Sequence, residues 1–221
     1  MTDDPFAAHR PLLVEELRRA VDGVSLHNGA VLRQQVSSGS ESDAGLLPGL
    51  LCLLTAEALS GRAESALPAA TALTLLTTMA EVFGTISVAS NDEGLIHSWG
   101  MPRTLNAGDA CFALAQETLL KAHSLDAGRR LKATGLLDRA ARATSDSLFE
   151  RASANATSVS RAELLSAAMA LGALSAGAND QTVEQMGAYG RSLLSGRGEV
   201  LPGDLADRLS PAAAYVAEVR Q

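Results

Sequence analysis

The sequence predicts an all-α protein, a helical bundle around a central elongated apolar cavity. Hydrophobic residues make up 47% of the chain, and aromatic residues only 3%. Alanine and leucine dominate, and both favour helices. Apolar residues recur three and four positions apart along most of the chain, and no long stretch alternates with a period of two. A chain of 221 residues can bury one large core, so we expect a single domain over residues 1–221.

The pattern of apolar runs and breaking residues gives the expected helices. They cover about 6–24, 46–59, 68–86, 105–123, 127–151, 161–176, 180–194 and 204–219. The first has Pro11 near its start and Gly23 near its end, the usual placement of these two residue types. The stretch 37–42 reads Ser-Ser-Gly-Ser-Glu-Ser, and this polar composition predicts a flexible loop.

Charge and composition argue against several functional classes. The formal net charge is −7, and lysines and arginines do not cluster with aromatic residues, which argues against nucleic-acid binding. No uninterrupted apolar run reaches the length of a membrane span, and the acidic N-terminus has no secretory apolar core. We therefore expect a cytoplasmic protein without a membrane span. Cys52 and Cys111 have no metal-binding spacing, and we expect both to be thiols.

One segment carries the most specific pattern. Residues 99–115 place Trp-Gly shortly before Asn-Ala-Gly-Asp-Ala-Cys-Phe-Ala-Leu-Ala. Three further alanine- and leucine-rich segments, at 47–59, 66–73 and 169–178, occur in the same order along the chain as their counterparts in one known family. Over residues 46–194 the chain resembles the trans-prenyl (isoprenyl) diphosphate synthase family. The resemblance implies the isoprenoid-synthase fold, with a C-terminal part that is truncated relative to the family.

The residues that give this family its activity are missing. Family members bind Mg²⁺ and a diphosphate through two aspartate-rich motifs, because hard cations need carboxylate oxygens. Aligned from Pro68 without a gap, the aspartates of the first motif fall at Gly84, Thr85 and Val88. Where the second motif is expected, residues 195–202 contain two glycines and a proline, which disfavour a helix.

The basic residues that would bind the diphosphate are absent as well. Residues 43–45 and 160–161 stand where the family has its lysines and arginines, and they read Asp-Ala-Gly and Ser-Arg. The remaining acidic pairs, Asp92-Glu93 and Asp204 with Asp207, are interpreted as solvated carboxylates. The resemblance therefore implies a degenerate member that does not transfer prenyl groups, is not an enzyme and binds no Mg²⁺.

The first functional hypothesis is that the former substrate cavity binds an elongated hydrophobic small molecule. A linear tetrapyrrole such as biliverdin (a bilin) and an isoprenoid both suit a long apolar cavity. The family's cavity-depth positions are Met79 and Ala80, beside Phe83. Arg103 or His97 would pair with a carboxylate, and Cys111 would add covalently to a bilin if its pKa were lowered. The predicted ligand-binding residues are Met79, Ala80, Phe83, His97, Arg103, Asn106 and Cys111.

The second hypothesis is structural. Some prenyl synthases are heteromers with a small subunit that lacks the aspartate motifs, and this chain would be such a regulatory subunit. The family associates through the helices around the Asn-Ala-Gly-Asp segment, where Leu114, Leu119 and Leu120 would serve. We expect a homodimer, or a heterodimer with a catalytic prenyl synthase.

Overall fold

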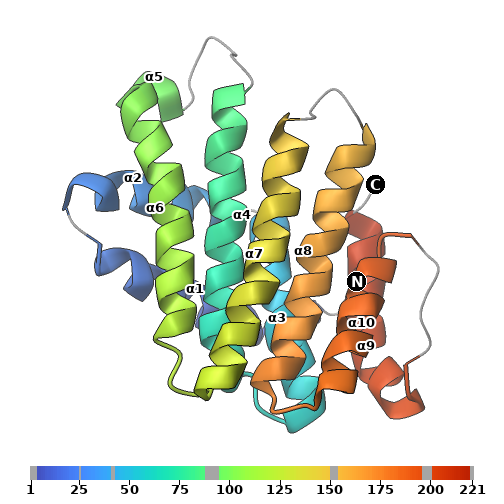
Figure 1. Cartoon of the computed structure of the whole chain (residues 1–221). Coiled ribbons are helices and arrows are strands. Elements are labelled where there is room, and N and C mark those ends of the chain that lie inside the picture. Colours follow the sequence, from blue (N-terminus) through green and yellow to red (C-terminus); the bar gives the residue numbers. More distant parts are fainter. Residues whose placement is uncertain are drawn as a thin grey trace.

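The computed structural model describes residues 4–24, 26–40, 43–87, 95–149, 154–195 and 201–219. Within these ranges all regular structure is helical, which confirms the all-α prediction (Figure 1). The helices are α1 (His9–Asp22), α2 (Leu26–Ser40), α3 (Asp43–Ser60), the short 3₁₀ helix η1 (Glu64–Ala66), α4 (Leu67–Ser87), α5 (Leu95–Trp99), α6 (Met101–Leu120), α7 (Ala127–Phe149), α8 (Ala154–Ser175), α9 (Asp180–Ser192) and α10 (Gly203–Val219).

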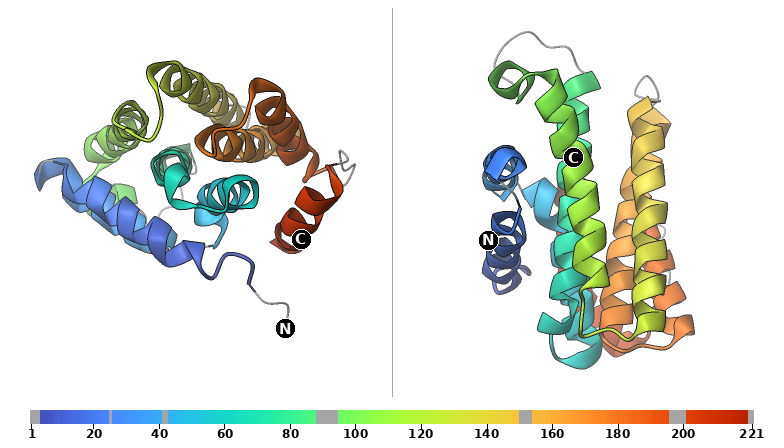
Figure 2. Two further views of the ribbon diagram at one scale, coloured as in Figure 1. Left: turned by 90° about the horizontal axis from the view of Figure 1, so that it is seen from below. Right: turned by 60° about the vertical axis from the view of Figure 1, so that its left-hand side comes forward.

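Helices α3 and α4 form the centre of the bundle. Seen end-on, they lie inside a ring made by the other long helices (Figure 2). α6, α7, α8 and α9 stand side by side on one side, and α1 and α2 cover the opposite side (Figures 1 and 2). α4 contacts α3, α6, α7, α8 and α1, so most of its circumference is covered.

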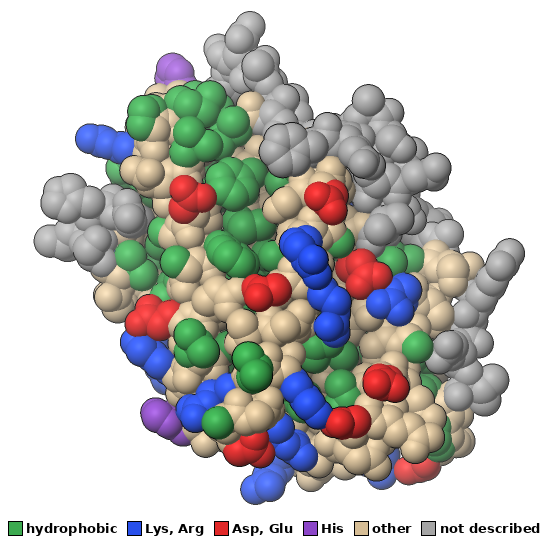
Figure 3. All heavy atoms as spheres, in the orientation of Figure 1, with side chains coloured by type: hydrophobic (Ala, Val, Ile, Leu, Met, Phe, Trp, Pro, Cys, Tyr) green, Lys and Arg blue, Asp and Glu red, His purple; other side chains and the backbone are tan. Residues whose placement is uncertain are grey.

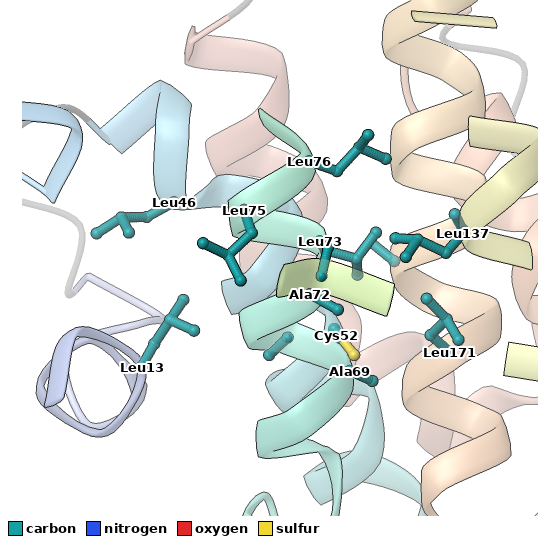
Figure 4. Close-up of a cluster of buried hydrophobic side chains, with 14 of the residues drawn as sticks. Leu13, Leu46, Cys52, Ala69, Ala72, Leu73, Leu75, Leu76, Leu137 and Leu171 are labelled. Atoms are coloured by element: carbon teal, nitrogen blue, oxygen red, sulfur yellow. The ribbon is translucent and has the colours of Figure 1, made fainter. Parts of the chain in front are cut away.

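The sequence of α4 explains its central position. Leu73 points toward Leu137 of α7 and Leu171 of α8, whereas Leu75 points to the opposite side, toward Leu46 of α3 (Figure 4). A helix that is apolar on all sides is stable only where neighbours surround it. The stretch Glu64–Ile86 is long and apolar enough to cross a membrane, but 67% of that window is buried inside the fold. It is therefore accounted for as a core helix.

Glycines permit the closest helix contacts. A Cβ atom added to Gly172 of α8 would overlap the carbonyl oxygen of Cys52 in α3, and one added to Gly190 of α9 would overlap the carbonyl oxygen of Leu165 in α8. α8 is thus held between α3 and α9 by backbone-to-backbone approach. Such contacts leave no space for even one extra methyl group.

The prediction of a flexible loop at 37–42 is wrong for residues 37–40, which form the last turn of α2; residues 41–42 lie outside the described residues. Val31, Leu32 and Val36 of this helix are buried in the core. Their packing outweighs the weak helix propensity of the serines and the glycine that follow. The sequence analysis had no helix over residues 26–40.

The Trp-Gly pair forms a corner between two helices. Gly100 has φ +77° and ends α5, and Pro102 lies in the first turn of α6. α6 therefore begins at Met101, earlier than the predicted start at Leu105. The indole nitrogen of Trp99 donates a hydrogen bond to Oε1 of Gln34 in α2, at 2.8 Å. The remaining helices follow the predicted ranges, although α8 begins at Ala154.

We predict that Gly172→Ala destabilises the protein by about 1–3 kcal/mol, because the methyl group overlaps backbone that cannot move without separating α3 from α8. The free energy of unfolding, measured by urea denaturation, tests this. Gly135→Ala on α7 is the matched control, since a Cβ there meets nothing within 4 Å. It is expected to stabilise by about 0.5–1 kcal/mol. Equal effects of the two substitutions would contradict the close contact.

Candidate functional site

An apolar cavity of about 220 Å³ lies between α3, α4, α8 and α10. Its lining residues are Ala44, Leu47 and Pro48 from α3, Thr77 and Glu81 from α4, Arg161, Leu164 and Leu165 from α8, Leu194 after α9, and Val216 from α10. Most of these side chains are apolar, and the polar ones are Thr77, Glu81 and Arg161.

Glu81 is the acidic residue of this cavity. It is half-buried, and Nε2 of Gln35 in α2 donates a hydrogen bond to its Oε2 at 3.3 Å. Within the described ranges no lysine, arginine or histidine nitrogen lies within 4 Å of its carboxylate. Burial raises the pKa of Glu81, and the hydrogen bond from Gln35 lowers it by less. Among the described residues, the carboxylate therefore has one hydrogen-bond donor, Gln35, and no cation within 4 Å.

Threonines extend the polar surface of α4 around Glu81. The hydroxyl groups of Thr74, Thr77 and Thr78 each donate to the carbonyl oxygen four residues earlier, at 3.0, 3.1 and 2.9 Å. Thr74, Thr78 and Glu81 also line a second space of about 10 Å³, close to what one water molecule needs. Glu81 thus lies between the main cavity and this water-sized space.

The positions aligned with the first aspartate motif follow directly after Glu81. Gly84 and Thr85 lie about one turn further along α4, and the Thr85 hydroxyl donates to the carbonyl oxygen of Val82 at 2.7 Å. Neither residue carries a carboxylate that could bind Mg²⁺. Val88 and the pair Asp92-Glu93 lie outside the described residues. The residues that are described here do not fit the family's metal site.

The other acidic pair does not add to the site. Asp204 and Asp207 are both exposed, at the beginning of α10. In the described part of the chain no three His, Cys, Asp or Glu side chains form a group that could hold a metal ion. The expectation that the protein binds no Mg²⁺ stays a prediction.

The seven predicted ligand-binding residues fall into two groups, and none of them lines the cavity. Met79, Ala80 and Phe83 of α4 and Cys111 of α6 belong to two helices that pack extensively on each other. Met79 and Cys111 are buried, and Ala80 and Phe83 are partly buried. His97, Arg103 and Asn106 are exposed on α5 and α6. The structure therefore does not bring these residues together around one ligand.

The Phe83 ring fills the space that Gly108 leaves. A Cβ atom at Gly108 would lie 2.5 Å from Cε1 of Phe83. The glycine of the Asn-Ala-Gly-Asp segment thus has a packing role between α4 and α6. Asp109, next to it, is exposed.

Sequence reasoning missed Thr77, Glu81 and Arg161. A signal for Glu81 was present, because it is the one charged residue in the sequence of residues 67–87. It also lies four residues after Thr77 and three before Gly84, which places all three on one helix face.

Burial raises the pKa of Cys111 to about 12, and the negative charge of Glu81 contributes to the increase. The pKa of Cys52 is raised by burial as well. A thiol with a raised pKa is a poor nucleophile at neutral pH. The structure therefore gives no support to covalent capture of a bilin by a Cys111 thiolate.

We predict that neither Cys52 nor Cys111 reacts with a thiol reagent such as DTNB at neutral pH, because both are buried and protonated in the folded chain. Both should react once guanidinium unfolds the protein. Rapid labelling of one thiol in the native protein, lost in Cys111→Ala, would contradict this assignment.

We predict that Glu81→Gln raises the urea midpoint at neutral pH. The pKa of Glu81 is higher in the folded chain than in the unfolded chain, so folding favours the protonated form. Its contribution to stability is present below the unfolded pKa, about 4.3, and is lost as the pH rises through the folded value. The gain from Glu81→Gln should therefore shrink toward about pH 4.5. Exposed Glu184→Gln on α9 is the control, and a gain that is independent of pH would contradict the raised pKa.

No family sequence profile matches the chain, and no characterised protein is significantly similar to it in sequence. Its fold, however, is shared with solved prenyl diphosphate synthases. A polyprenyl synthetase from Streptomyces coelicolor A3(2) superposes with a TM-score of 0.73 at 20% identity, over 87% of this chain and 63% of that one. The chain thus spans less than two thirds of the length of that enzyme.

Two shorter structures match over nearly their whole length. One is a mint heterotetrameric geranyl pyrophosphate synthase, with a TM-score of 0.67 and 16% identity over 95% of this chain and 92% of that one. The other is the geranyl diphosphate synthase small subunit from Antirrhinum majus, with a TM-score of 0.62 and 15% identity over 96% and 93%. The chain therefore has the all-α isoprenoid-synthase fold of the prenyl diphosphate synthases.

Proposed function

We propose that this chain is a non-catalytic, prenyl-synthase-like subunit that associates with a catalytic prenyl diphosphate synthase. The observation that carries the proposal is an exposed apolar surface on α6, which we call the α6 face and define as Met101, Leu105, Phe112 and Leu120. Met101 and Leu105 are each 41% exposed, Leu120 is 59% exposed and Phe112 is partly buried. Hydrophobic side chains gather over α5 and the first part of α6, at the end of the molecule where α6 begins (Figure 3).

The spacing of these residues places them on one broad side of α6. Positions 101, 105, 112 and 120 are separated by four, seven and eight residues. A contiguous apolar surface on a folded protein marks an interaction site, whereas scattered apolar residues do not. Leu131, at the start of α7, is 75% exposed and adds apolar surface on the next helix.

The structure revises which of the predicted interface leucines can contribute. Leu119 is fully buried in the core, Leu114 is partly buried, and Leu120 is exposed. Only Leu120 of the three therefore presents most of its side chain to a partner. The predicted association through this helix stays a proposal, with different residues at its centre.

The missing carboxylates and the similar solved structures support the same function. Gly84 and Thr85 supply no metal ligands, so we infer that the chain does not ionise an allylic diphosphate. Two of the similar structures belong to a heterotetrameric synthase and to a synthase small subunit, and both match this chain over more than 90% of their length. We place the protein in the cytoplasm, as the sequence predicts.

Binding of biliverdin or a long isoprenoid receives less support. Drug-sized ligands occupy pockets of about 300–1,000 Å³. The cavity beside Glu81, of about 220 Å³, is smaller than that, and His97, Arg103 and Cys111 line neither it nor the more open hollow of about 820 Å³ beside α1 and α6. We therefore favour the subunit function over the binding of an elongated ligand.

We predict that co-expression with the catalytic prenyl diphosphate synthases of the same organism yields a stoichiometric heteromer with one of them. Native mass spectrometry would detect the complex, and product analysis would show a changed chain-length distribution. Leu105→Glu should weaken the complex at least about tenfold, because it places a charge in an apolar contact.

Leu12→Glu on α1 is the matched control, since Leu12 is 40% exposed and Leu105 is 41% exposed. It should leave the complex unchanged. A chain that stays monomeric or homodimeric with every catalytic synthase would overturn the proposal, as would equal weakening by the two substitutions.

A further inference from the structure

We propose that the cavity between α3, α4, α8 and α10 binds a small primary amine, with the ammonium group on Glu81 and the alkyl chain against the apolar walls. This inference concerns a site of this chain's own, and it does not depend on the α6 face or on a partner synthase. The hydrogen-bonding character of the site, its charge and its size all favour such a ligand.

The polar atoms beside Glu81 are mainly acceptors. The Thr77 hydroxyl donates its hydrogen to the carbonyl oxygen of Leu73, so its lone pairs are left to accept. Thr77 and Glu81 are four residues apart on α4 and both line the cavity. One carboxylate oxygen of Glu81 already accepts from Gln35. An ammonium group carries three donors and no acceptor, so it matches this surface better than a carboxylate or a phosphate does.

The charge of the site points the same way. In the described part of the chain no cationic nitrogen lies within 4 Å of the Glu81 carboxylate, although the group is half-buried. Arg161 is the cation that lines the cavity, and it is exposed on α8. A partly desolvated carboxylate without a cationic partner gains more from a ligand cation than a solvated one does.

The walls set the size and the nature of the ligand's tail. The apolar surface comes from three helices, with Leu47 and Pro48 on α3, Leu164 and Leu165 on α8, and Val216 on α10. A cavity of about 150 Å³ lined by similar side chains is large enough to hold benzene. The volume of about 220 Å³ therefore suits a chain of about six carbon atoms with its head group.

The test is calorimetric titration of the full chain with n-hexylamine, 1-hexanol and hexanoate at neutral pH. We expect hexylamine to bind at least about tenfold more tightly than hexanol, and hexanoate not to bind, because only the amine forms a charge-assisted hydrogen bond with Glu81. Glu81→Gln should remove the preference for the amine while hexanol still binds. Glu184→Gln on α9 removes the same charge away from the cavity and should change nothing.

Several results would overturn the proposal. Equal affinity for the amine and the alcohol in the wild type would show that Glu81 does not select the head group. Binding of hexanoate instead of hexylamine would assign recognition to Arg161. Failure of all three probes would show that the cavity takes no such ligand. Leu105 lies outside the cavity, so Leu105→Glu should leave hexylamine binding intact. Failure of the subunit proposal can therefore be distinguished from failure of the amine-binding proposal.

Discussion

The structure depends on the burial of α4. This helix contacts most of the other helices, among them α1, α3, α6, α7 and α8, and its leucines point to opposite sides of the bundle (Figure 4). Burial on nearly every side is favourable only if the helix carries almost no charge. Two carboxylates at positions 84 and 85 would repel each other without a bound cation, and their pKa values would rise. Loss of the aspartates is therefore compatible with the close packing that the rest of the bundle needs.

One charged residue remains within this helix, and its surroundings determine what the site can do. Glu81 accepts a hydrogen bond from Gln35 and lines the cavity shared by α3, α8 and α10. Its charge also reaches the other side of α4, where it helps raise the pKa of Cys111. Burial, with a smaller contribution from this carboxylate, thus keeps the pKa of the Cys111 thiol high and the thiol protonated. The two residues cannot be assigned roles independently of each other.

The helices were largely predictable, because the spacing of apolar residues that determines them can be recognised in short stretches of the sequence. The bounds of α3, α4, α7, α9 and α10 agree closely with the helices that the sequence predicts. α2 was missed because only Val31, Leu32 and Val36 mark its buried side, and the polar residues 37–40 hide its last turn. The start of α6 was predicted too late, at Leu105. Gly100 has a positive φ angle, and the helix begins at the next residue, with Pro102 in its first turn. In both cases tertiary contacts outweigh local propensity.

The site was less predictable than the fold, because family positions say where a substrate binds in relatives and not which side chains face the cavity in this chain. Met79 and Cys111 are buried between α4 and α6, on a different side of α4 from Thr77 and Glu81. The sequence therefore pointed to α4 as part of the site, but not to the side of α4 that lines this cavity.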